Sequence, residues 1–405
     1  MSPLSDGGQQ TGLQGHCIVS MALEDWHSTW RSRHHLLSRL AADNDVLYCT
    51  PPIFSHDVRD RWRRRSELPP GVEPILPRLL AYRPPYWIPQ VFRPAWLCSG
   101  QRRRLVRHMR GVLRARGWKP SLLYVWHPAF AELADEFPEC PLVYHVYDEY
   151  ASFETDPARQ QMVLESERRL LERAVMVFTA SETLKSRRLA HNPNIQAISN
   201  GVDYALFSRA ADPELPVPAD VAALKAPVIG YVTTQTTITD LPLLREVFGR
   251  RPDWTFLFVG LHPDEIAKPS PALAALQALP NVHLIGPRKL QEMPGYLKRC
   301  DVLAIPWLVN EISLSGSPLK LYEYLAAGKP VISTPLTHLR HLEPVIAFAD
   351  GAAAWVDAID RALKGQAPGT SATRQAVARD NTWDAKAQEL SRRLQSALGR
   401  GLLRS

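Results

Sequence analysis

The stretch SGSPLKLYEYLAAGKPVIST, residues 315–334, predicts a helix that leads directly into a strand. Ser317 is a good N-cap, Pro318 suits the first helical position, and Gly328 suits the end of the helix. Apolar side chains between residues 321 and 325 give the helix one buried face. The segment 330–334 that follows has the short apolar pattern of a buried strand. This order of elements favours an α/β fold.

The polar side of the same helix carries a lysine and a glutamate. Lys320 lies in the first turn, where unpaired backbone N–H groups and the helix dipole already favour an anion. A lysine there is useful when a phosphate binds both it and the helix end. Glu323 lies on the same face, about 4.5 Å further along the axis, roughly the step from a diphosphate to ribose hydroxyls. This predicts a nucleotide-diphosphate clamp; a solvated Lys–Glu pair is the alternative.

Small residues precede this helix and add further residues to the predicted nucleotide-binding site. The loop ISLSGS lets backbone amides approach a phosphate. The donor-binding prediction comprises Lys320, Glu323, Ser317, Leu319, Gly316, Ser315, Arg288 and Thr233.

Strands alternate with helices along two parts of the chain, which predicts two parallel-sheet domains. Apolar runs at 16–23, 45–52, 121–128, 141–150 and 175–181 indicate the first set of strands, and 228–232, 255–260, 282–286, 301–307 and 330–334 the second. The Pro- and Ala-rich stretch 211–227 is the best linker candidate. We therefore predict an N-terminal domain at 1–205, a linker at 206–226, a C-terminal domain at 227–380 and a final helix at 381–405.

Composition is that of a globular protein, with 405 residues, 45% apolar and 22% charged. No apolar run reaches the length of a membrane span, and the polar N-terminus does not resemble a secretory signal. The five cysteines lack CxxC spacing, so we expect reduced thiols and neither a zinc site nor disulfides. Residues 1–120 hold 19 Lys and Arg against 9 Asp and Glu, a balance of +10 in a chain of +7. A basic first part indicates an anionic partner.

The segment SPLKLYEYLAAGKPVIST resembles the nucleotide-binding helix of group 1 bacterial glycosyltransferases with the GT-B fold, including related glucuronosyltransferases. The resemblance extends through NVHLIGPRKLQEMPGYLKRCDVLAIPW, AISNGVDYALF, YHVYDEYASF and NTWDAKAQEL. It implies two Rossmann-like domains facing each other across a cleft. The acceptor would bind the N-terminal domain and the donor the C-terminal domain, and the last helix, 381–405, would cross back to the first domain. It also implies transfer of a sugar from a nucleotide diphosphate donor, with a UDP-sugar favoured.

The sequence departs from the group 1 pattern in two places. Many such enzymes carry a second glutamate eight positions before the one in the helix, but Ser315 stands there and Glu311 is displaced by four. This leaves retention or inversion of stereochemistry open. The glycine-rich turn expected after the first strand of the second domain is replaced by YVTTQTTITD, whose hydroxyls either contact the donor or merely form a turn.

Sugar transfer to a hydroxyl needs a base and positive charge on the departing diphosphate. Asp148 follows a predicted strand directly and is the first candidate base, ahead of Asp25 and Glu24 after the first strand. His127, also at a strand end, is better explained as a structural residue. We expect no metal ion and no cofactor beyond the nucleotide-sugar substrate. Asn200 and Asp203 are best explained by a turn.

The stretch 83–110 mixes aromatic side chains with arginines, a combination suited to an anionic membrane surface. The acceptor or membrane side is predicted at Trp87, Phe92, Trp96, Arg102, Arg103 and Arg104; internal packing of the aromatics is the alternative. No nucleic-acid-binding module is recognisable.

The sequence thus predicts a cytoplasmic, peripheral inner-membrane glycosyltransferase of cell-surface polysaccharide or glycolipid biosynthesis, acting on a glycan or lipid-linked acceptor. The alternatives are a non-catalytic nucleotide-sugar or lipid-binding protein, and a GT-B sugar-nucleotide 2-epimerase. The donor base and sugar, the acceptor and the oligomeric state are left open.

Overall fold

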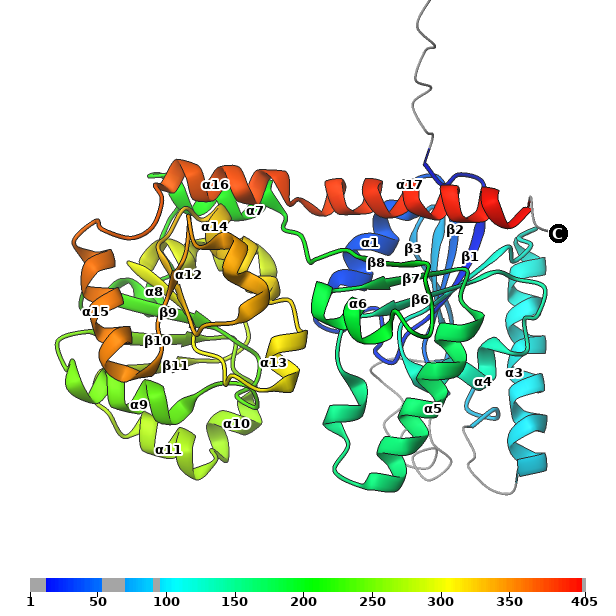
Figure 1. Cartoon of the computed structure of the whole chain (residues 1–405), viewed down its shortest axis with the longest axis horizontal. Helices are drawn as coiled ribbons and strands as arrows, with labels where there is room; N and C mark the ends of the chain where they lie inside the picture. Colours follow the sequence, from blue (N-terminus) through cyan, green and yellow to red (C-terminus); the bar gives the residue numbers. More distant parts are fainter. Residues whose placement is uncertain (1–11, 53–69, 90–94, 403–405) are drawn as a thin grey trace, which may run out of the picture. The chain divides into compact units, whose positions relative to one another are not determined.

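The computed structural model describes residues 12–52, 70–89 and 95–402. The chain divides into two compact units (Figure 1). Unit 1 comprises the residues up to Ser199 together with those from Lys386 onward, and unit 2 comprises Asn200–Ala385. The C-terminal helix α17 (Trp383–Leu402) therefore begins in unit 2 and continues in unit 1.

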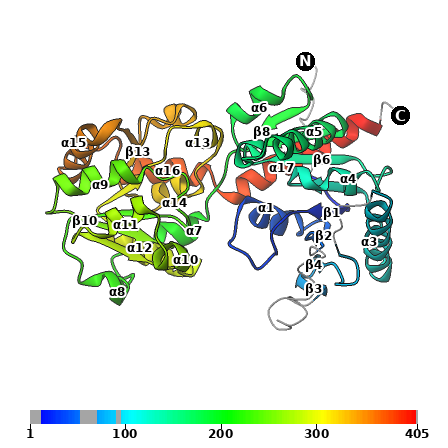
Figure 2. The ribbon, with the colours of Figure 1, turned by 90° about the horizontal axis from the view of Figure 1, so that it is seen from below.

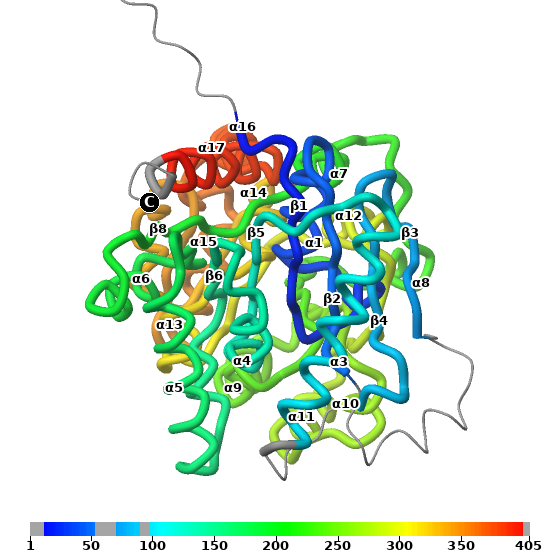
Figure 3. The backbone as a smooth tube through the Cα atoms, turned by 90° about the vertical axis from the view of Figure 1, so that its right-hand side faces the viewer, coloured from blue at the N-terminus to red at the C-terminus, as the bar shows by residue number. Residues whose placement is uncertain are grey.

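Unit 1 is built on a sheet whose eight described strands follow the order β3-β4-β2-β1-β5-β6-β7-β8 (Figure 3). All neighbours pair in parallel except β3, which is antiparallel to β4. The strands are β1 (Cys17–Met21), β2 (Asp45–Cys49), β3 (Gly71–Leu76), β4 (Leu79–Arg83), β5 (Leu122–Val125), β6 (Leu142–Val146), β7 (Met176–Thr179) and β8 (Ile195–Ala197).

One face of this sheet is covered by helices whose apolar sides enter the core. Leu105, Met109 and Leu113 of α3 pack with Val19 and Leu123 of the strands, because alternate strand residues face the same way. The helices and short helical turns are α1 (Ser32–Leu40), α3 (Ala95–Ala115), η1 (Pro128–Phe130), α4 (Ala131–Ala134), η2 (Tyr150–Phe153), α5 (Pro157–Arg173) and α6 (Glu182–Arg188). Figure 2 shows α4 beside α3.

Unit 2 has a sheet whose six described strands are all parallel and follow the order β11-β10-β9-β12-β13-β14. They are β9 (Val228–Val232), β10 (Thr255–Val259), β11 (Val282–Ile285), β12 (Val302–Ile305), β13 (Val331–Ser333) and β14 (Ala347–Phe348). The predicted α/β fold with two parallel-sheet domains is confirmed.

Helices surround the unit 2 sheet and bury a large apolar core. They are α7 (Tyr204–Phe207), α8 (Ala219–Ala222), α9 (Leu241–Arg250), α10 (Pro263–Ala267), α11 (Pro271–Gln277), α12 (Met293–Arg299), α13 (Glu311–Ser315), α14 (Leu319–Ala326), α15 (Gly351–Leu363) and α16 (Ser371–Asp380). Short 3-10 turns η3 (Ser208–Ala211), η4 (Leu290–Glu292) and η5 (Thr337–Leu342) join them.

Two details differ from the sequence expectations. The segment 206–226, expected as a linker, lies within unit 2, because Phe207, Ala210 and Val221 are buried in its core. The Pro- and Ala-rich segment is therefore packed against unit 2 and is not a free linker. Residues 71–83, which the sequence analysis did not assign to any strand, form the hairpin β3–β4, whose strand β4 is fully buried.

Candidate functional site

The strand order of unit 2 reverses between β9 and β12, since the chain builds outward from β9 on one side and from β12 on the other. Parallel sheets bind ligands at the carboxyl ends of the strands at such a point. Helix α14 is fixed there, because the hydroxyl of Tyr324 accepts a hydrogen bond from the backbone N–H of Val232 at 2.8 Å. The predicted clamp on α14 therefore lies at the switch point of its sheet.

Two aromatic rings hold the ammonium of Lys320. Its Nζ lies 4.7 Å from the ring centroid of Tyr231 on β9 and 5.5 Å from that of Trp307, which follows β12. Such cation–π contacts fix an ammonium without neutralising it. Lys320 has no ion pair with any residue that the structure describes. The positive charge at the start of α14 is thus positioned but not compensated.

Glu323 lies one turn further along α14 and is partly buried. Burial raises the pKa of its carboxyl to about 7, and the nearby Lys320 only partly opposes this shift. The carboxyl has no hydrogen bond or ion pair within the described ranges. The Glu323 carboxyl can therefore accept hydrogen bonds from the hydroxyl groups of a ligand.

The start of α14 differs in detail from the prediction. The helix begins at Leu319 with Pro318 as N-cap, and no side chain caps it. Ser317, predicted as the cap, stands one residue too early, and its carbonyl accepts a hydrogen bond from the side chain of Asn200 at 2.7 Å. The helix ends at Ala326, and its C-cap Ala327 is followed by the predicted stop residue Gly328, whose φ of 72° suits glycine.

The other predicted residues lie close to this helix start, but most of the segment expected as a loop belongs to α13, which ends at Ser315. Ser315 and Gly316 are buried, Leu319 is half-buried, and a Cβ on Gly316 would lie 3.8 Å from the Trp307 ring. Thr233 follows β9, where its hydroxyl donates to the carbonyl of Gln235 at 2.6 Å. The structure thus brings Ser315, Gly316, Ser317 and Leu319 to the clamp and places Thr233 at the end of the neighbouring strand.

Arg288 has partners of its own in unit 2. Its guanidinium donates to Asp220 at 2.8 Å and to the hydroxyl of Tyr296 at 2.6 Å. These bonds connect the turn after β11 to α8 and α12. Arg288 is therefore engaged within the fold, and a donor-binding role would require it to leave Asp220.

Unit 1 has its own switch point, between β1 and β5. Asp148 follows β6 on this edge of the sheet and is partly buried. Burial raises the pKa of Asp148 to about 6, helped by the carboxylates of Glu24 and Glu149 and opposed by Arg31. Its carboxyl makes no hydrogen bond or ion pair with the residues described. It is ionised at neutral pH and available to accept a proton.

The two acids after β1 are held by arginines. Asp25 accepts two hydrogen bonds from Arg83, at 2.6 and 3.1 Å. Burial alone would disfavour the Asp25 carboxylate, but the Arg83 bonds outweigh it and the pKa of Asp25 is lowered. Glu24 pairs with Arg33, which is 1% exposed, at 3.0 Å. The Asp25 carboxylate is therefore a weaker base than that of Asp148.

The neighbours of Asp148 have structural partners. Glu149 and Glu167 share Arg188 in a buried network, with distances of 2.8 and 3.0 Å. His127 caps η1 by accepting from the backbone N–H of Ala129, and burial lowers its pKa to about 4. Asp203 in unit 2 likewise caps α7.

The predicted acceptor or membrane residues lie on and before α3. Trp87 is 64% exposed and packs edge-on against His108 of α3. Arg102 pairs with Glu132, while Arg103 and Arg104 are exposed. Phe92 lies outside the described residues, and of Trp96 only the backbone, in the first turn of α3, is described.

Sequence reasoning missed the aromatic support of Lys320. By sequence alone, Tyr231 is only a strand residue and Trp307 only the end of DVLAIPW. Trp307 Nε1 and the hydroxyl of Thr334 are buried and lack a hydrogen-bond partner among the described residues. Only the positions of Tyr231, Trp307 and Thr334 in the sequence could have indicated a site, because all three lie in or just after strands near the switch point.

Neither a metal cluster nor a membrane span emerges from the part of the chain that the structure describes. No group of three or more His, Cys, Asp or Glu side chains there is arranged to hold a metal ion. Within the same ranges, no helix combines the length and apolarity that crossing a bilayer requires.

The fold matches that of known GT-B proteins. Sucrose-phosphate synthase from Thermosynechococcus elongatus superposes with a TM-score of 0.70 at 16% identity, covering 96% of this chain and 99% of that one. Anabaena Alr3699/HepE in complex with UDP and glucose gives 0.65 at 14% identity, covering 94% and 100%. The family model described as Glycosyl transferases group 1 matches residues 232–365, which include the clamp. Residues 232–365 are therefore similar to the group 1 glycosyltransferases, the fold is that of GT-B proteins, and the predicted resemblance is confirmed.

One curated protein is similar to part of this chain. The "Putative teichuronic acid biosynthesis glycosyltransferase TuaH" of Bacillus subtilis (strain 168) is 31% identical over 182 residues, which are 44% of this chain. The match spans 45% of that protein, less than half of its length.

Proposed function

We propose that this chain is a glycosyltransferase that moves a sugar from a nucleotide diphosphate, with a UDP-sugar favoured, to a glycan or lipid-linked acceptor. One observation carries the proposal: the uncompensated ammonium of Lys320, boxed by two aromatic rings at the start of α14, with Glu323 one turn further on. The match of this region to the group 1 family and the UDP bound by the structurally similar HepE support it.

In this proposal the nucleotide binds along α14. Lys320 and the N–H groups at the helix start attract the diphosphate, and Glu323 accepts hydrogen bonds from the ribose hydroxyls. As the bond between sugar and phosphate breaks, negative charge grows on the leaving diphosphate. Lys320 stabilises that charge, so its contribution increases in the transition state. The mechanism draws on these groups and needs no additional cofactor.

The acceptor is assigned to unit 1. Its hydroxyl oxygen forms the new bond to the sugar carbon, and its proton passes to Asp148, whose pKa of about 6 suits a base at neutral pH. The name of the B. subtilis relative supports a cell-surface polysaccharide as the product. The exposed Arg104 of α3 and the exposed Trp87 support a peripheral position at the anionic inner membrane face.

The test is a calorimetric titration of the full chain with UDP, GDP and their sugar conjugates. We expect one UDP-sugar to bind, and Lys320→Met to weaken it about 10- to 100-fold, as for loss of a hydrogen bond to a charged group. Lys364→Met removes an exposed lysine of the same unit and serves as the control. Equal affinity of both variants, or transfer activity that survives in Lys320→Met, contradicts the clamp. Conversion of the donor sugar without an acceptor would instead indicate an epimerase.

A further inference from the structure

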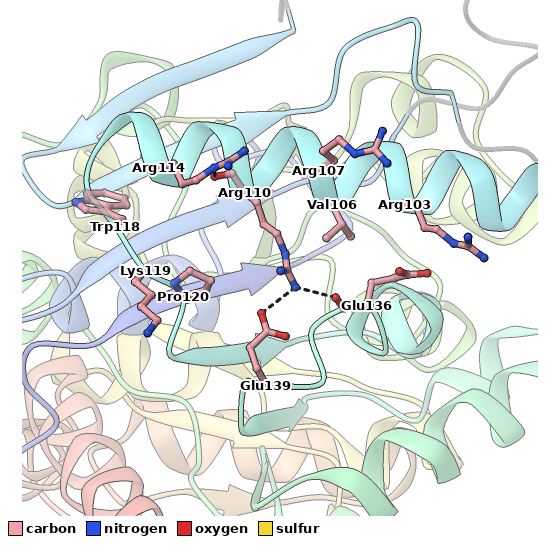
Figure 4. A pocket seen from close by; sticks show the side chains of 10 residues that line it. All are labelled: Arg103, Val106, Arg107, Arg110, Arg114, Trp118, Lys119, Pro120, Glu136 and Glu139. Carbon is pink, nitrogen blue, oxygen red and sulfur yellow. Dashed lines mark hydrogen bonds and ion pairs between the residues drawn. The ribbon is translucent and has the colours of Figure 1, made fainter.

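A groove lies beside α3 in unit 1, and Asp148 is not among the residues that line it. Its volume is about 600 Å³, and it lies between α3 and the turn that follows α4 (Figure 4). It is lined by Arg103, Val106, Arg107, Arg110, Arg114, Trp118, Lys119, Pro120, Glu136 and Glu139.

One wall of the groove is a row of cations. Arg103, Arg107, Arg110 and Arg114 are spaced by four, three and four residues, so they share one face of α3. The row extends about 16 Å along the helix, and Lys119 continues it beyond the helix end. Arg103, Arg107, Arg114 and Lys119 are exposed, and none of them forms an ion pair with a residue that the structure describes.

Arg110 connects the helix to the opposite wall. Its guanidinium donates to Glu139 at 2.8 Å and to the carbonyl of Glu136 at 3.1 Å, and lies 5.1 Å from the Phe137 ring centroid. These bonds hold the turn at a set distance from α3 (Figure 4). The two walls of the groove are therefore held together by Arg110, while its other cations form no ion pair with the described residues.

The chemistry of the two walls differs from that of a uniformly basic patch. Glu136 and Glu139 place carboxylates in the groove, where they repel a dense array of phosphates but accept hydrogen bonds from hydroxyl groups. Trp118 is half-exposed at one end and offers an indole face. The site therefore combines cations for spaced negative charges, acceptors for hydroxyls and an aromatic surface for a ring.

We infer that this groove binds an acidic oligosaccharide, a segment of the glycan on which the enzyme acts. Uronate carboxylates pair with Arg103, Arg107 and Arg114, and the sugar hydroxyls donate to the two glutamates. The length of the row corresponds to several sugar rings. A flat anionic membrane fits a concave, partly acidic site less well. The inference rests on the proposed function and deepens it by naming the acceptor as an anionic chain held at a second point.

The experiment measures binding of hexagalacturonate to the full chain by calorimetry, with maltohexaose as the neutral probe. We expect hexagalacturonate to bind and maltohexaose to bind at least tenfold more weakly. Arg107→Gln and Arg114→Gln should each weaken hexagalacturonate binding about twofold to fivefold, as for exposed ion pairs. Arg116→Gln removes an exposed arginine outside the groove and should leave the affinity unchanged.

Each other outcome overturns the inference. Equal losses in Arg116→Gln and Arg107→Gln would indicate unspecific attraction. Failure of hexagalacturonate to bind, together with Arg107-dependent binding of phosphatidylglycerol vesicles, would assign the groove to a membrane. Nucleotide binding is measured separately, with UDP: if UDP binds and hexagalacturonate does not, only the groove assignment fails, and if only hexagalacturonate binds, the proposed transfer function fails.

Discussion

The two units place polar side chains at equivalent points of their sheets but use them differently. In unit 2, Lys320 has no ion pair among the described residues, and two rings hold it in place. In unit 1, the acids that follow β1 are each bound to an arginine, and Asp148 keeps a carboxyl without such a partner among the residues described. Position at a strand end is therefore not enough to define a functional residue. The presence or absence of an internal partner divides these groups into structural and available ones.

The largest expected effect concerns the available carboxylate of unit 1. Asp148→Asn keeps the shape of the side chain but removes the base, so we expect kcat to fall about 10²- to 10⁴-fold. UDP-sugar affinity, measured by calorimetry, should stay unchanged. In the unaltered enzyme, kcat/KM should rise with pH through about pH 6, as Asp148 loses its proton. Asp25→Asn is the matched control. A larger fall in kcat in Asp25→Asn than in Asp148→Asn would make Asp25 the base.

The next effect tests the structural side of the same comparison. Arg188 is 3% exposed and binds both Glu149 and Glu167. Arg188→Met leaves Glu167 without its cation and Glu149 with only the more exposed Arg187, so the free energy of unfolding should fall by about 3–5 kcal/mol. Urea denaturation measures it. Arg187→Met removes a more exposed partner of Glu149 and should cost about 1 kcal/mol or less. Similar losses in both variants would show that the buried network is not the stabilising feature.

A third prediction separates the rings around Lys320 from the charge itself. Tyr231→Leu removes one of the two ring faces, and we expect UDP affinity to fall about threefold to tenfold, the range of a cation–π contact. Tyr231→Phe keeps the ring and loses only the hydroxyl bond to Thr239, so its affinity should stay within about twofold. If both variants lose affinity equally, the hydroxyl and not the ring positions Lys320.

The pH dependence of Glu323 gives a smaller effect with a definite sign. Burial raises the pKa of this carboxyl to about 7, above its ordinary value of 4.5. Between these two pH values the folded protein binds more protons than the unfolded chain, so this group makes the protein less stable as pH rises. Glu323→Gln should remove that decline. The difference in melting temperature between the variant and the unaltered protein should therefore grow from pH 5 to pH 7.5. A constant difference would contradict the raised pKa.

Ligand binding should show the opposite pH trend. Ribose hydroxyls donate to the carboxylate form of Glu323, so UDP affinity should increase as pH rises through about 7 and flatten in Glu323→Gln. Calorimetry at pH 6 and pH 8 measures both proteins. Unchanged affinity between these pH values would remove Glu323 from the clamp.

The sequence was sufficient for what depends on local patterns. Apolar runs and helix ends predicted both parallel sheets and placed Lys320 and Glu323 on one helix near its start. It failed where the outcome depends on partners distant in sequence. Nothing local shows that Asp25 meets Arg83, 58 positions later, or that Trp307 packs beside Lys320. The segment 206–226 looked like a linker for the same reason, since its burial comes from residues elsewhere in unit 2.

The smallest expected effect concerns the exposed tryptophan beside α3. Trp87 is 64% exposed, and an indole at the headgroup level adds apolar area to the attraction between arginines and anionic lipid. Trp87→Ala should therefore weaken binding to phosphatidylglycerol vesicles about twofold to fivefold, measured by sedimentation at physiological salt. Trp30 is 41% exposed but lies before α1, so Trp30→Ala is the matched control and should bind vesicles as the unaltered protein does. If Arg104→Gln weakens binding and Trp87→Ala does not, the contact is electrostatic and the ring stays outside the lipid. If neither substitution changes binding, the membrane assignment of this surface fails, while the nucleotide clamp of unit 2 is unaffected because it is measured with UDP alone.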